Sequence, residues 1–148
     1  MKRSVNIVIK KLIEGIGRRL SALEIINMVY LLNWYSALLD EEYYTETFEW
    51  LTSPVCAISN DLKRHILSNN IFIKEKINDL DFISEVDIPD EYLTPREEAY
   101  LSLVIKEYNG DIDNIINLVK ASYPFKKGMM NAKIDLLKLA KEYKNSLS

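Results

Sequence analysis

One cysteine and one histidine are the only side chains of those two types in this chain of 148 residues. They are Cys56 and His65, nine positions apart. On the helix expected here that spacing is about two and a half turns, which puts them on opposed faces and too far apart for a catalytic dyad. A free cysteine is more typically a small buried apolar residue. We therefore predict no thiol chemistry at Cys56.

Metal and phosphate sites lack the residue patterns that they need. Glu41-Glu42 and the run 87–91 offer only carboxylates, without the spacing of an EF-hand loop. The glycines do not form a phosphate-binding loop, because Gly15-Ile16-Gly17 follows an expected helix rather than a strand. The sequence thus predicts no enzyme activity, no cofactor and no metal centre.

The charges are segregated along the chain. Residues 120–148 contain seven lysines against Asp135 and Glu142, a net charge of 7 − 2 = +5, and the remainder carries 12 − 20 = −8. The total of −3 gives no general reason to expect nucleic-acid binding. Lysines of the basic tail could still contact phosphates, although the acidic body would repel them: Lys126, Lys127, Lys133, Lys138, Lys141 and Lys144. We keep a nucleic-acid-binding regulator as an alternative function.

Aromatic and acidic residues together favour a protein partner. Aromatic residues lie at the expected edges of elements, where they anchor protein interfaces when exposed: Tyr43, Tyr44, Trp50, Tyr123 and Phe125. The acidic residues at 40–42 and Glu46 adjoin the two tyrosines and would suit a basic partner. The alternative, that many of these aromatics are core residues, stays open.

The segment 21–39 must be the buried axis of the domain, because it is apolar on every helical face. Ser21 and Glu24 form a capping box at its start. Its hydrogen-bonding side chains either bond within the core or open onto a partner at one end, around Trp34 and Tyr35: Asn27, Tyr30, Asn33, Trp34 and Tyr35.

Other helices follow from periodicity and caps. We expect them over 4–16, over 54–67 beginning with Pro54, from 94 to 108, from 111 to 119, and over 129–143. Alternation predicts a strand at 45–52, and 71–77 is expected to pair with 48–50 as a hairpin. Residues 78–93 read as a surface connection with one short strand at 82–86. The fold class is mainly α (α+β), a compact single domain over 1–148 with a small β-hairpin or ribbon.

Composition also bears on location. A single cysteine excludes an internal disulfide, the N-terminus lacks signal-peptide features, and no apolar run approaches the ~18 residues of a membrane span. We expect a cytoplasmic protein with no membrane role. The many Ile, Asn, Lys and Tyr residues suggest an AT-rich genome, such as that of a low-GC bacterium or its phage.

The order of these elements resembles the Panacea domain, the SocA-like antitoxin family, over roughly residues 5–144. Three stretches carry the resemblance: 23–39 with its Tyr30-Leu-Leu-Asn-Trp-Tyr35 core, 48–55 ending in Ser53-Pro54-Val55, and 93–125 with Tyr108-Asn109-Gly110. The sequence departs from the family at Ser53, where the family has glycine, at Lys120-Ala121, and at Phe125 in place of tryptophan. A glycine there would permit a positive φ that Ser53 adopts only at a cost.

The resemblance implies a mostly helical, non-enzymatic protein that neutralises a protein partner. The first hypothesis for that partner is a toxin. The alternatives are a phage-encoded inhibitor of a host defence complex, or a proteolytic adaptor. The residues that we expect in or beneath the partner-binding surface are Trp34, Tyr35, Trp50, Ser53, Pro54 and Phe125, with Glu42, Tyr43 and Tyr44 at its edge. A homodimer is left open.

Overall fold

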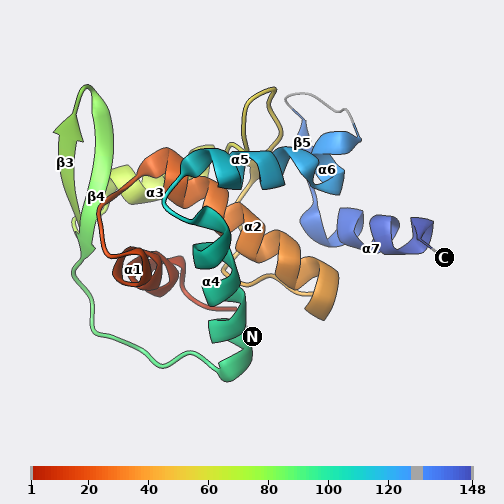
Figure 1. Ribbon diagram of the computed structural model, residues 1–148, viewed down its shortest axis with the longest axis horizontal. Coiled ribbons are helices and arrows are strands. Elements are labelled where there is room, and N and C mark those ends of the chain that lie inside the picture. The colour runs from red at the N-terminus through yellow and green to blue at the C-terminus, as the bar shows by residue number, and fades with distance from the viewer. Residues whose placement is uncertain (1, 128–131, 148) are drawn as a thin grey trace.

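A computed structural model describes residues 2–127 and 132–147 of the chain (Figure 1). Within these residues seven helices and five short strands follow one another: α1 (Val5–Ile16), β1 (Leu20–Ser21), α2 (Ala22–Asp40), β2 (Trp50–Leu51), α3 (Asn60–Ser68), β3 (Phe72–Ile77), β4 (Leu80–Val86), α4 (Pro95–Tyr108), α5 (Ile112–Ala121), α6 (Tyr123–Lys126), β5 (Lys133–Ile134) and α7 (Leu136–Ser146). The mainly α fold class with a small antiparallel sheet is thereby confirmed.

Helix α2 is the axis of the domain, as its uniformly apolar sequence predicts. It starts at the Ser21–Glu24 capping box, and α1, α3, α4, α5 and α7 all pack against it. By length and composition α2 would also suit a membrane span, so the expectation that no apolar run approaches that length is wrong. Most of the helix is buried inside the protein, as in a core helix. Only its two ends reach the surface, where Leu23 and Leu39 are exposed.

The sheet corrects the strand pairing that we predicted. Strand β3 does not pair with 48–50; it forms a hairpin with β4, and β1 adds to the other edge of β4. The reason is the two-residue turn Asn78-Asp79, in which both residues have positive φ (51° and 65°) and so return the chain directly beside β3. The short strand expected at 82–86 is the second half of β4.

Strand β2 has a different partner. The strand expected over 45–52 is confined to Trp50–Leu51, which pairs with Lys133 and Ile134 of β5. Because 133–134 are held in this ribbon, the last helix cannot run over 129–143 and instead starts at Leu136, with Asp135 as its N-cap. Residues 128–131, which include the predicted start of that helix, lie outside the described part of the chain.

The third helix begins six residues later than predicted, at Asn60 instead of Pro54. Residues 53–58 form a loop, because the backbone of Ile58 exchanges two hydrogen bonds with Leu51 (2.8 and 3.0 Å) and is held in an extended conformation. Ser59 then caps α3 by accepting from the Leu62 N–H. Cys56 therefore lies in the loop and His65 in the helix, so the two do not share a helix.

The amides of α2 bond within the core. Asn33 donates to the Val29 carbonyl and to Thr45 Oγ1, and its side-chain carbonyl accepts from the N–H groups of Tyr44 and Thr45 at 2.9 and 3.1 Å. One buried side chain thus satisfies two backbone donors of the segment that follows α2.

Replacing Asn33 with Ala should destabilise the fold by about 2 to 4 kcal/mol, because two buried N–H groups lose their acceptor. Urea unfolding followed by circular dichroism measures the loss. Asn117→Ala, on the exposed side of α5, is the matched control and should stay within about 0.5 kcal/mol of the parent protein. Equal stabilities for the two variants would contradict this role of Asn33.

A second long-range tie joins the N-terminus to α4. Glu97 completes the capping box of α4 with Thr94 and also accepts two hydrogen bonds from the Arg3 guanidinium, at 2.6 and 2.8 Å. The Arg3 guanidinium beside Glu97 lowers the pKa of that carboxyl from 4.5 to about 2.

The lowered pKa of Glu97 predicts how the stability of the protein changes at low pH. Because the pKa of Glu97 is lower in the folded state, its stabilisation is fully present above about pH 4.5 and is lost as pH falls towards 2. Glu97→Gln keeps a capping residue but removes the charge. Between pH 5 and 2 its free energy of unfolding should therefore fall less steeply than that of the parent protein. Exposed Glu98→Gln should follow the parent curve; a parent-like slope for Glu97→Gln would refute the assignment.

Candidate functional site: an apolar groove beside the hairpin

An open groove of about 890 Å³ lies between the start of α2 and the tip of the β3–β4 hairpin. Figure 1 shows the β3–β4 hairpin on the side of the molecule where α2 begins. The lining of the groove comes from three separate segments and two single residues: residues 21–24 with Ile26 and Asn27, residues 56–60, residues 79–82, Lys63 and Ile112. A cavity of this size and composition is typical of a binding site.

The groove keeps apolar side chains in contact with water. Leu23 of α2 is 46% exposed and Leu80 of the hairpin is 59% exposed, although most large apolar residues of α2 are fully buried. Phe82, Ile58 and Ile112 are half-buried in the same lining. Exposed apolar surface rimmed by polar residues is a mark of interaction sites.

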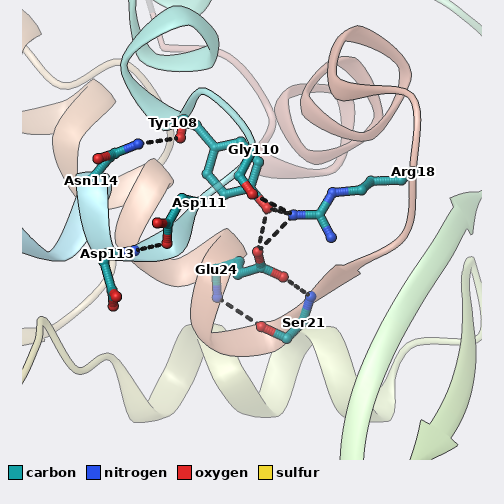
Figure 2. Close-up of polar contacts among 8 residues, drawn as sticks. All are labelled: Arg18, Ser21, Glu24, Tyr108, Gly110, Asp111, Asp113 and Asn114. Carbon is teal, nitrogen blue, oxygen red and sulfur yellow. Dashed lines mark hydrogen bonds and ion pairs between the residues drawn. The ribbon is translucent and has the colours of Figure 1, made fainter.

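A polar cluster around the buried residues Glu24 and Tyr108 fixes one end of the groove (Figure 2). The Glu24 carboxylate accepts from the Ser21 N–H at 2.9 Å and from the Tyr108 hydroxyl at 2.5 Å, and it pairs with Arg18 at 3.6 Å. Arg18 in turn donates to the Tyr108 hydroxyl and to the Gly110 carbonyl. The start of α2 is thus tied to the turn between α4 and α5.

Ser53 shapes the loop that forms another wall. Its hydroxyl accepts from the N–H groups of Val55 and Cys56, at 3.2 and 3.0 Å, and donates to the Cys56 carbonyl at 2.6 Å. Ser53 is not among the residues with positive φ, and its turn is closed by the side-chain hydroxyl. Pro54 is exposed beside it.

Asn27 ties the same loop to the core. Its side-chain carbonyl accepts from the Ala57 N–H at 2.9 Å, and its amide donates to the carbonyls of Leu23 and Ala57 at 3.0 and 3.4 Å. Hydrogen bonds to the core therefore hold this wall of the groove in place.

Three of the aromatic residues predicted for the partner site are packed in the protein. Trp50 and Phe125 each contact the Tyr30 ring edge-on at 5.7 Å, and Trp50 is only 2% exposed. Trp34 is buried against Tyr143. They form two aromatic clusters, one of Trp50 and Phe125 around Tyr30 and one of Trp34 with Tyr143, and none of the three lines the groove.

Tyr35 is half-buried and donates to the carboxylate of Glu107 at 2.9 Å. Burial raises the pKa of both groups. This pair joins α2 to α4, and neither residue belongs to the groove lining.

Glu42, Tyr43 and Tyr44 line a second, smaller pocket of about 120 Å³. An internal ion pair between Arg96 and Asp40 crosses it, and the Tyr100 hydroxyl donates to the same aspartate at 2.8 Å. Burial, the main cause, raises the pKa of Tyr100 to about 12. The predicted site residues thus do not gather on one surface, and only Ser53 and Pro54 adjoin the groove.

The basic tail folds against the acidic body. Lys144 pairs with Glu41 at 2.9 Å and Lys133 with Glu49 at 3.4 Å. Lys127 pairs with Glu142 within the tail itself. Half of the six lysines considered for phosphate contacts are therefore neutralised internally, which weakens the case for nucleic-acid binding.

The residues that we examined for catalysis have structural contacts. His65 bonds Asn6 at 2.7 Å and lies between the rings of Phe48 and Phe72. In the described part of the chain no group of three or more His, Cys, Asp or Glu residues could hold a metal ion.

Sequence reasoning missed the groove itself, because its walls are distant in the chain. Two signals pointed to it: Leu23 lies at the first turn of a helix that is apolar all round, and Leu80 directly follows a two-residue turn. Neither signal reveals that the two side chains face a common space.

Cys56 reports on the groove wall, because it lines the groove yet is only 8% exposed. Ser53→Ala removes an acceptor from two N–H groups of the loop, so a maleimide should label Cys56 about 10-fold faster or more. Mass spectrometry gives the rate. Ser102→Ala, an exposed site on α4, should leave it unchanged. Unchanged labelling in Ser53→Ala would show that the hydroxyl does not hold the loop.

Comparisons with known proteins returned nothing: no family model matches the chain, and neither a curated protein nor a solved structure matches it. The Panacea resemblance accordingly stays a prediction, and the groove has to be argued from its own geometry.

Proposed function

We propose that this chain is a non-enzymatic protein-binding domain that neutralises a protein partner by covering it in a stoichiometric complex. The observation that carries the proposal is the groove, where Leu23 and Leu80 keep large apolar surface in water between walls held by hydrogen bonds. Such surface is costly to leave exposed unless a partner covers it.

A toxin is the partner that the sequence favours. The motifs at 23–39, 48–55 and 93–125 resemble the Panacea family, whose members act as antitoxins or proteolytic adaptors. A fixed groove supports masking, because a preformed surface loses little conformational freedom on binding. A viral inhibitor of host defence would use the same groove but would have its partner encoded elsewhere than beside its own gene.

If the groove binds the toxin, changes in its lining should abolish the protection of a cell that produces the toxin. Each gene adjacent to the one for this chain is expressed in a bacterial host, and growth arrest is scored with and without this protein. The parent protein should restore growth, whereas Leu23→Asp and Leu80→Asp should each weaken the complex about 10-fold or more and lose protection, since a charge enters an apolar contact.

Two variants control for surface charge and for folding. Leu39→Asp, at the other end of α2, and Leu103→Asp, on α4, change exposed leucines outside the groove and should protect fully. All four variants should retain the circular dichroism of the parent protein. Protection that survives Leu23→Asp and Leu80→Asp would refute the groove as the binding site, and the absence of any toxic neighbour would refute the antitoxin function.

A further inference from the structure

We infer that the groove receives an amphipathic α-helix of the partner, with its apolar face on Leu23 and Leu80 and a lysine or arginine towards the hairpin tip. This inference rests on the proposed function, because it specifies what the proposed protein partner presents. It follows from the hydrogen bonding of the walls and from the charge at the tip.

The backbone of the groove walls is already paired. The N–H and carbonyl of Ala57 bond Asn27, those of Ile58 bond Leu51, and those of Cys56 bond the Ser53 hydroxyl. Strand β4 pairs with β3 along one edge, and β1 covers Phe82 and Ile83 on the other.

An extended partner segment would find few backbone groups in these walls to pair with, and its own N–H and carbonyl groups would lose water without compensation. A helix satisfies its backbone groups internally and needs from the groove only apolar contact. Helices dock in this way through side chains at i, i+3 or i+4, and i+7.

The tip of the hairpin supplies the charge. Asp79 and Asp81 both line the groove, and neither forms an ion pair with any residue that the structure describes. The carboxylates of Glu24, Glu75 and Glu97, by contrast, are each paired with an arginine. Lys63 is the one basic residue among the described residues of the lining, against Glu24, Asp79 and Asp81. The lining therefore keeps a net negative charge, which complements a basic residue on the partner.

The turn holds this charge in place. Asn78 and Asp79 both have positive φ, a conformation that a two-residue hairpin turn requires and that asparagine and aspartate tolerate. Asp79→Asn therefore removes the charge without loss of the turn, which makes a clean test possible.

The test selects peptides on the folded, full-length chain. A displayed library of random 16-residue peptides is enriched on the parent protein and depleted on Leu23→Asp. We expect the selected peptides to repeat apolar residues every three or four positions and to include a lysine or arginine. A proline in the centre should abolish binding, and a staple joining residues i and i+4 on the outer face should tighten it several-fold.

Charge variants complete the experiment. The double change Asp79→Asn and Asp81→Asn should weaken these peptides about five-fold and remove most of the dependence of their affinity on salt. Glu98→Gln, an exposed carboxylate far from the groove lining, should change neither. Leu39→Asp should bind as the parent protein does.

Three outcomes would overturn the inference: no enriched peptide, enriched peptides with apolar residues at every second position that tolerate a central proline, or unchanged binding to the double aspartate variant. The growth assay separates this failure from failure of the proposed function. Loss of protection in Leu23→Asp with no helical binder would leave the groove as the partner site but refute the helix. Helical binders that require Leu23, found where no neighbouring gene is toxic, would support the helix but refute the antitoxin function alone.

Discussion

The fold depends on one constraint, that a helix apolar on every face has to be covered on every side. Five other helices pack around α2, and so most of the chain is arranged by that single requirement. Full burial also brings polar groups with it. A buried polar side chain needs hydrogen-bonding partners. Asn27 and Asn33 find theirs in the backbone N–H groups of two loop segments, which these bonds hold against α2.

Local signals predicted the helices well. The caps at Ser21, Thr94 and Asp111 mark where α2, α4 and α5 begin, because a cap is decided by residues within one turn. The predicted start at Pro54 was wrong, since proline suits a turn as well as a first helical residue, and the long-range pairing of Leu51 with Ile58 decided between them. Strand partners were wrong for the same reason: β2 meets β5 across more than eighty residues.

The candidate site was harder to predict than the fold. Tryptophan and tyrosine suit both cores and interfaces, so their types did not reveal that Trp34 and Trp50 face inward. The charged segments were equally ambiguous. An acidic turn and a basic tail suggest two external partners, yet Lys144 and Lys133 meet Glu41 and Glu49 of the same chain. Some of the segregated charges therefore form ion pairs between the tail and the body of the same chain.

The bond from Ala57 to Asn27 links the groove to the core in a way that has a kinetic consequence. A movement of the loop that widens the groove must first break the hydrogen bond between Ala57 and Asn27 of the central helix. Opening of the groove and local opening of the core at Asn27 are therefore the same conformational equilibrium. The amide hydrogen of Ala57 is enclosed at that junction. It would exchange with solvent deuterium only at the frequency of the shared opening, and a partner seated in the groove would slow its exchange by making that opening rarer.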